Sequence, residues 1–198
     1  MKLRWLPVLA LVCLWLGGCE CYSLYPLYTQ KDAVVEPALE GTWMGTETDD
    51  KSEITFSKSK NGGYEFSIFD PSTKIKTTYD ANLVQLAGAL FMDIRLSEET
   101  LNGASVDQPL GMVPMHEIVK VKISADDLAY ATLEEDSFKG AKPDGGTGLK
   151  HETLDKNTLF PSVVITAETE DLRRYIAAHA EDGFSQFEHL KRVTKTGN

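Results

Sequence analysis

Short runs in which hydrophobic and polar residues alternate fill most of the chain from residue 40 onward. In one run, Tyr64, Phe66 and Ile68 alternate with Glu65 and Ser67. Successive side chains of a strand point to opposite faces of a sheet, so a period of two predicts half-buried β-strands. Similar runs predict strands in the ranges 40–46, 53–57, 75–83, 90–96, 119–123, 128–132, 163–165 and 190–194. Many short strands separated by turn residues are typical of an antiparallel sandwich or barrel.

One stretch has the spacing of an amphipathic helix, from about Glu168 to Ala180. Leu172, Ile176 and Ala180 recur every four residues, which places them on one face of a helix. Together with the strands, this helix predicts a mainly β fold, an antiparallel β-barrel of about eight strands with one C-terminal amphipathic helix. The ranges 97–114 and 134–150 have no clear period, and we expect long loops there, the second with a short helix near 136–139.

The first eighteen residues have the composition of an export signal. Lys2 and Arg4 precede an uncharged, mostly apolar stretch from Trp5 to Leu16. This stretch is too short to cross a membrane as a helix, which needs about 20 residues, but it fits a secretion signal. The next residues, Leu16-Gly17-Gly18-Cys19, resemble the lipobox of bacterial lipoproteins, in which the cysteine is acylated and becomes the new N-terminus. An ordinary signal peptide cut nearby, with Cys19 a plain thiol, is the alternative.

The lipobox resemblance implies an organisation and a location for the chain. Residues 1–18 would be the signal peptide, Cys19 the site of lipid attachment (palmitate or a similar acyl chain), 19–40 a tether and lead-in, and 41–198 the barrel domain. Aromatic residues crowd the lead-in, so we expect it to pack back along the domain. Because Glu20 and not aspartate follows Cys19, the resemblance favours the outer membrane facing the periplasm over the inner membrane. A cell with a single membrane would display the protein on its surface.

The net charge and the cysteine content restrict the kinds of partner that the protein can bind. With 20 basic and 30 acidic residues the net charge is −10, and loss of Lys2 and Arg4 with the signal leaves 18 − 30 = −12. Such an acidic chain is unsuited to nucleic acid and is repelled by anionic lipid, so the acyl chains and not a basic face would hold it at the membrane. After export and lipidation, Cys21 is the one thiol left, so no internal disulfide forms. We interpret Cys21 as a passive thiol, with an intermolecular disulfide or a third acyl site as alternatives.

No motif for catalysis or metal binding is found. The four histidines lack the spacing of a zinc site, and there is no Gly-x-Ser-x-Gly nucleophile motif. The sequence therefore predicts a protein that is not an enzyme, without catalytic residues, cofactor or metal site. The histidines are His116, His151, His179 and His189.

Glu117 is the residue that breaks its local pattern. If Val119, Val121 and Ile123 face the barrel interior, strand parity places Glu117 inward and His116 outward. A carboxylate inside a barrel is costly unless it is paired, so this placement indicates a polar ligand or a buried cation. Alternatively, the strand starts after Glu117 or a bulge resets its parity.

Two sets of motifs resemble known families. Gly41-Thr42-Trp43, with the hairpins and the late helix, resembles the lipocalin-like barrels of the calycin group. The segments 24–29 and 37–43 are similar to a family of uncharacterised bacterial lipoproteins. The calycin resemblance implies that Trp43 plugs the closed end of the barrel with Arg192 or Lys191 over it. The strand after the helix and the long break at 97–114 depart from that pattern.

Two functions follow as hypotheses. The first is a non-enzymatic, lipid-anchored envelope protein whose barrel binds a hydrophobic or amphipathic small molecule, with Trp43 and Glu117 as candidate lining residues. The second is an interaction module that docks on another envelope protein through the loops at 97–114 or 134–150. Because fold alone does not determine function, the residues lining the barrel have to decide between them.

Overall fold

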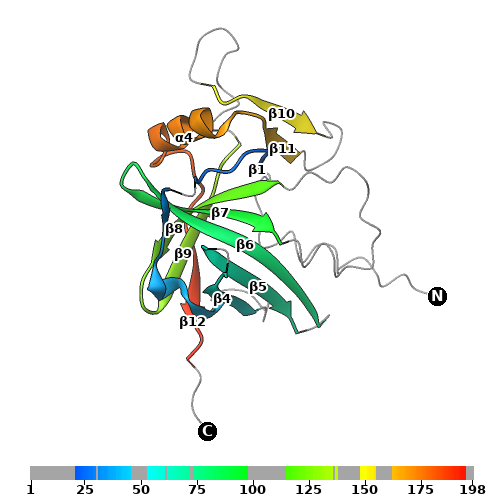
Figure 1. Ribbon diagram of the computed structural model, residues 1–198, viewed down its shortest axis with the longest axis vertical. Coiled ribbons are helices and arrows are strands. Elements are labelled where there is room, and N and C mark those ends of the chain that lie inside the picture. The colour runs from blue at the N-terminus through cyan, green and yellow to red at the C-terminus, as the bar shows by residue number, and fades with distance from the viewer. Residues whose placement is uncertain are drawn as a thin grey trace, which may run out of the picture.

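The computed structural model describes residues 21–29, 31–45, 53–60, 62–71, 74–97, 115–135, 137, 148–154 and 162–194. Eight antiparallel strands form a closed barrel in the order β3-β4-β5-β6-β7-β8-β9-β12, and β12 closes it by pairing with both β9 and β3 (Figure 1). The strands are β3 (Gly41–Gly45), β4 (Glu53–Lys58), β5 (Tyr64–Asp70), β6 (Ile75–Leu86), β7 (Ala89–Leu96), β8 (His116–Ile123), β9 (Asp127–Thr132) and β12 (Glu188–Arg192). The predicted mainly β fold with an antiparallel barrel of about eight strands is confirmed.

The alternating runs of the sequence become the two faces of this barrel. Inward-facing residues lie opposite one another across neighbouring strands, as in the pairs Phe56↔Phe66 and Ile54↔Ile68. The Phe66 ring stacks on those of Phe56 and Tyr79, with centroids 5.0 and 4.8 Å apart. Such aromatic cross-strand pairs fix the register, because a slip of one residue would turn every inward side chain to the solvent.

A second layer covers part of the outer barrel wall. It contains β1 (Cys21–Ser23), β10 (His151–Leu154), β11 (Ser162–Ile165) and the helix α4 (Thr169–Ala178). In Figure 1 this layer lies above the barrel, where β1 joins it to β8. β1 pairs antiparallel with β8 and parallel with β11, and β10 pairs antiparallel with β11. The strand predicted at 163–165 is therefore confirmed, but it belongs to this layer and not to the barrel.

The predicted helix is also confirmed, with its apolar face on the second layer. Leu172, Tyr175 and Ile176 of α4 are buried, as the four-residue spacing predicts. They join an apolar core between the layer and the outer barrel wall, which includes Phe91 and Ile118. Among the described residues, no helix is long and apolar enough to span a membrane.

The lead-in packs back along the domain, as expected from its aromatic composition. Cys21 is buried and the Leu27 side chain is fully buried in the core beneath α4. The chain then forms β2 (Ala33–Val34), which pairs with β6, and the 3-10 helix η1 (Pro37–Leu39), which leads into β3. Cys19, the signal peptide and most of the two predicted long loops, including all but one residue of the short helix expected near 136–139, lie outside the described residues.

Candidate functional site

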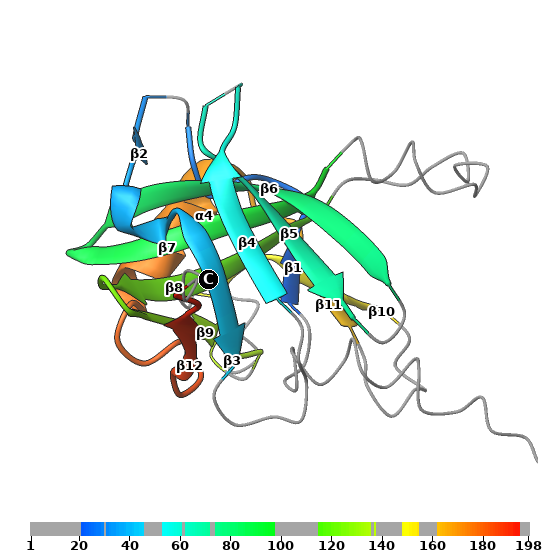
Figure 2. The same ribbon diagram turned by 90° about the horizontal axis from the view of Figure 1, so that it is seen from below.

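One end of the barrel is sealed by a tryptophan and an arginine. Trp43 is fully buried, and its indole N–H donates to the carbonyl oxygen of Leu39 at 2.9 Å. The Arg192 guanidinium lies 4.1 Å from the centre of the Trp43 ring, a cation–π distance. The same guanidinium donates to the backbone carbonyls of Ala38 and Glu40. β3 and β12, which carry these two residues, lie side by side (Figure 2).

The seal explains the first glycine of the Gly-x-Trp motif. Gly41 has a φ of +132°, which residues with a side chain rarely adopt, and a Cβ there would collide with the Arg192 guanidinium. The expectation that a basic residue covers Trp43 is met by Arg192. Lys191 instead points away from the interior and donates to Asp127 at 2.9 Å. That contact is the main reason why the pKa of Asp127 lies below its usual value.

At the opposite end the inward-facing side chains are only partly covered. Ile68, Tyr79, Ile94, Glu117 and Tyr130 are half-buried, whereas Trp43 and Tyr64 at the sealed end are fully buried. β8 starts at His116 and pairs with β7 without a bulge, so Glu117 stands opposite Ile94 and on the same face as Val119. The alternatives of a later strand start or a bulge are wrong, and Glu117 lies on the inward face.

Four side chains form a polar group at this end, which we call the open-end group: Tyr79, Glu117, Tyr130 and Glu188. The Tyr130 hydroxyl donates to the Glu188 carboxylate at 2.5 Å. Burial, followed by that hydrogen bond and by the negative charges of Glu188 and Glu117, raises the pKa of Tyr130 well above its usual value. Burial and then the charge of Glu117 raise the pKa of Tyr79. Glu117 thus acts electrostatically on both phenols, which stay protonated at neutral pH.

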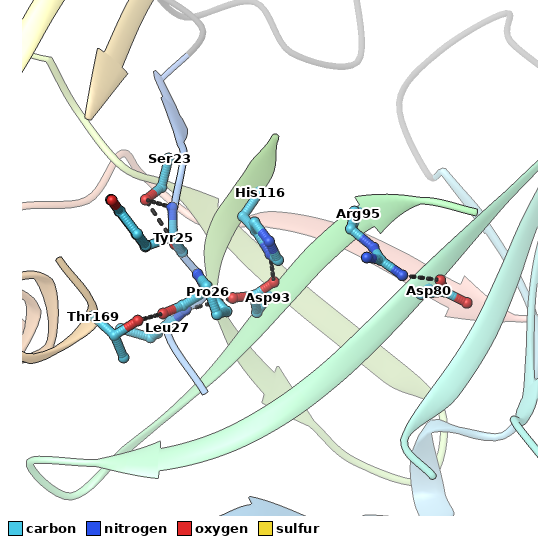
Figure 3. A network of polar contacts seen from close by, with 9 residues as sticks. All are labelled: Ser23, Tyr25, Pro26, Leu27, Asp80, Asp93, Arg95, His116 and Thr169. Atoms are coloured by element: carbon cyan, nitrogen blue, oxygen red, sulfur yellow. Dashed lines mark hydrogen bonds and ion pairs between the residues drawn. The ribbon is translucent and has the colours of Figure 1, made fainter. Parts of the chain in front are cut away.

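A second polar group lies on the outer wall of the barrel, under the second layer (Figure 3). We call it the buried clamp: Asp93, His116 and the backbone N–H of Leu27. The His116 ring donates from Nδ1 to Asp93 Oδ1 at 2.6 Å, and the Leu27 N–H donates to Asp93 Oδ2 at 2.6 Å. Asp93 is 1% and His116 8% exposed.

The helix holds the other side of the same segment. Thr169 at the start of α4 donates to the Pro26 carbonyl at 2.8 Å (Figure 3), and Arg173 donates to the Leu27 carbonyl at 2.7 Å. The lead-in is therefore fixed between the barrel wall and α4. A carboxylate next to a histidine also occurs in hydrolases, where the histidine activates a hydroxyl. Here Ser23, the cross-strand partner of His116, donates its hydroxyl to the Tyr25 carbonyl at 2.7 Å. The clamp thus has the contacts of a structural group.

The other histidines have local contacts. His179 follows α4, where its ring stacks on Tyr175, and His189 lies beside Asp127 on the surface. His151 contacts the carbonyl of Leu149. Within the described ranges, no group of three or more histidine, cysteine, aspartate or glutamate side chains is placed to hold a metal ion.

These features define a class of architecture: a closed eight-stranded antiparallel barrel, sealed at one end by Trp43 and Arg192, with a polar group at the other. A scan against protein-family models and searches of curated proteins and solved structures find no match to this chain. The assignment of a function therefore rests on the geometry.

Sequence reasoning located Trp43 and Glu117 but missed their neighbours. In the structure Glu117 shares the inward face near the open end with Tyr79 and Tyr130, and Trp43 lies toward the other end of the barrel. The parity that points Glu117 inward also points Tyr79 and Tyr130 inward, so the same signal was present for them. Which inward residues share one end of the barrel depends on the register between strands, which the alternation does not contain.

Proposed function

We propose that the protein is a lipid-anchored, non-enzymatic envelope protein whose barrel binds an amphipathic small molecule. The observation that carries this proposal is the difference in cover along the inward face. Leu39, Trp43 and Tyr64 are fully buried at the sealed end, whereas the inward-facing residues at the other end are half-buried and polar side chains stand among apolar ones. Ligand sites are mostly apolar and hold a few placed polar groups, and eight-stranded barrels can hold one small ligand.

Lipidation of Cys19 supplies the envelope part of the proposal. The first described strand, β1, starts only two residues later, at Cys21, and is built into the sheet. An acyl chain on Cys19 would therefore hold the domain close to the bilayer and not at the end of a long linker. Replacement of Cys19 by alanine is expected to release the protein from the membrane fraction. A Cys19→Ala protein that stays in that fraction would overturn the lipid anchor.

Native mass spectrometry tests the binding function. Every described contact lies within residues 21–194, so a chain that starts at Glu20 keeps all of them and lacks only the signal and the anchor. We expect this chain, isolated without detergent, to carry an additional mass that is released on denaturation. A bare mass, together with no binding of amphipathic probes, would overturn the proposal.

Docking on another envelope protein is the second candidate, and one observation favours it. Among the described strands, β10 pairs with β11 along one edge only, and Leu154 at its end is 49% exposed. An open edge strand can accept a strand from a partner. Photo-crosslinking from position 152 in intact cells is expected to capture one defined protein if this function holds. The same experiment gives no discrete adduct if the protein only carries a small molecule.

A further inference from the structure

The open-end group has a marked charge. Glu117 and Glu188 are its two carboxylates, whereas Tyr79 and Tyr130 contribute neutral phenols, as tyrosines do at pH 7. In the described parts of the barrel strands, the basic residues with inward parity are Lys58 and Arg192, and both stand at the sealed end. Lys58 pairs with Glu40 at 3.5 Å, and Arg192 is bound to the seal. Among these inward-facing residues of the described strands, the carboxylates of the open-end group and the basic side chains therefore lie toward opposite ends of the barrel.

The geometry of the open-end group suits a cation. Its phenols come from β6 and β9 and Glu117 comes from β8, so a carboxylate and two aromatic side chains share the inward face toward this end of the barrel. Aromatic rings next to carboxylates bind amines and quaternary ammonium groups through cation–π and Coulomb attraction. An anionic group at the same place would meet two negative charges in a partly desolvated environment, which is costly.

The stacked aromatic rings of Phe56, Phe66 and Tyr79 indicate where the apolar part of the ligand would lie. The Tyr79 ring stacks on Phe66 and Phe66 on Phe56, so stacked aromatic rings continue from the half-buried Tyr79 to the buried Phe66 and Phe56. A molecule with an apolar chain and a polar head would place its chain against these rings and its head beside Glu117. On this basis, and resting on the proposed function, we propose that the barrel selects amphipathic molecules with a cationic head group, an amine or a quaternary ammonium.

Three probes with matched alkyl chains test the head group. Isothermal titration calorimetry of the chain from Glu20 would measure the affinities for decyltrimethylammonium, decanol and decanoate at pH 7. We expect the trimethylammonium compound to bind most tightly, decanol next and decanoate most weakly, with about tenfold between the first and the last. This comparison uses the domain without substitutions, so its outcome does not depend on whether a variant folds.

Matched variants then localise the effect. Glu117→Gln is expected to weaken decyltrimethylammonium binding about tenfold and to leave decanol binding within about twofold. Glu65→Gln removes the same charge from the outer barrel wall, because Glu65 lies between the inward-facing Tyr64 and Phe66, and it is expected to change neither affinity. Equal losses in the two variants would show a general effect of net charge and overturn the site.

The outcomes separate the two proposals. If decanol or decanoate binds as tightly as the trimethylammonium compound, the cationic head group is wrong and the binding function stands. If none of the three probes binds, the head-group proposal is overturned, and if the native mass is also bare, the binding function is overturned with it.

Discussion

Two neighbouring residues of β8 belong to two very different polar groups. His116 points outward and Glu117 inward. The outward residue belongs to the buried clamp, where both oxygens of Asp93 have a partner at 2.6 Å and the second layer excludes water. The inward residue belongs to the open-end group, which is partly exposed to solvent.

The difference in burial between the two polar groups indicates which one stabilises the fold and which one can bind a ligand. A polar group that is fully buried and fully hydrogen-bonded fixes one conformation, because loss of one member leaves the others buried without a hydrogen-bond partner. A polar group that is half-exposed contributes little to stability, because water competes for every contact. It keeps the capacity to exchange water for a ligand. We therefore expect the clamp to control unfolding and the open-end group to control binding.

The largest expected effect is in the clamp. Replacement of Asp93 by alanine removes the partner of both the His116 ring and the Leu27 N–H, and leaves them in the core without an acceptor. Breaking a buried pair of this kind costs about 3–5 kcal/mol of the free energy of unfolding. Urea denaturation followed by circular dichroism measures the loss.

Asp80→Ala is the matched control for this prediction. Asp80 carries the same carboxylate on the same outer wall and pairs with Arg95 at 3.0 Å (Figure 3), but both side chains are about one-third exposed. Its loss should cost at most about 1 kcal/mol. If Asp93→Ala costs no more than Asp80→Ala, the clamp is not the structural group that its burial indicates.

The contact from α4 to the lead-in has a smaller expected effect. Thr169→Val keeps the shape of the side chain but removes the hydroxyl that donates to the Pro26 carbonyl. The expected loss is about 1 kcal/mol, the usual net value of one hydrogen bond. Hydrogen exchange of the Leu27 amide should quicken in parallel, because the lead-in is less firmly fixed. Unchanged exchange at Leu27 would mean that the barrel alone holds this segment.

Much of the fold could be predicted from the sequence because its signals are local. The alternation identified all eight barrel strands, and the four-residue spacing identified α4. The strands β1, β2 and β10 were missed, and β1 shows a physical reason. β1 has three residues and is held by two long-range pairings, with β8 and β11, so its own sequence contains no period to detect.

The candidate site was only half predictable. Strand parity placed Glu117 inward correctly, and the resemblance to calycins anticipated Arg192 over Trp43. The buried clamp could not be predicted from the sequence, because Asp93 and His116 meet only when β7 and β8 pair and the lead-in packs over them. An aspartate within an apolar strand was the one local signal, and its partners lie 23 and 66 residues away along the chain.

In the open-end group, Glu117→Gln is expected to change the free energy of unfolding by no more than about 0.5 kcal/mol, the size of a typical surface substitution. Its main effect is on binding, as described for the alkyl probes. Chemical denaturation of this variant beside Asp93→Ala makes the comparison direct, since the two positions lie on adjacent barrel strands. A loss above about 2 kcal/mol would show that Glu117 is a structural residue like Asp93.

The smallest effect at neutral pH is expected for Tyr130→Phe, which becomes visible only in alkali. The fold raises the pKa of Tyr130, through burial first and then its contact with Glu188, so the folded state keeps the phenol proton that the unfolded state loses near pH 10. Above about pH 10 ionisation of this phenol therefore favours the unfolded state, and the parent chain loses stability as the pH rises further, by up to about 1.4 kcal/mol per pH unit. Tyr130→Phe removes this loss, so the variant should match the parent chain at pH 8 and exceed it at pH 11 in urea denaturation. Equal stabilities at pH 11 would mean that the Tyr130 phenol ionises as freely as one in water, and that the open-end group is more hydrated than its burial indicates.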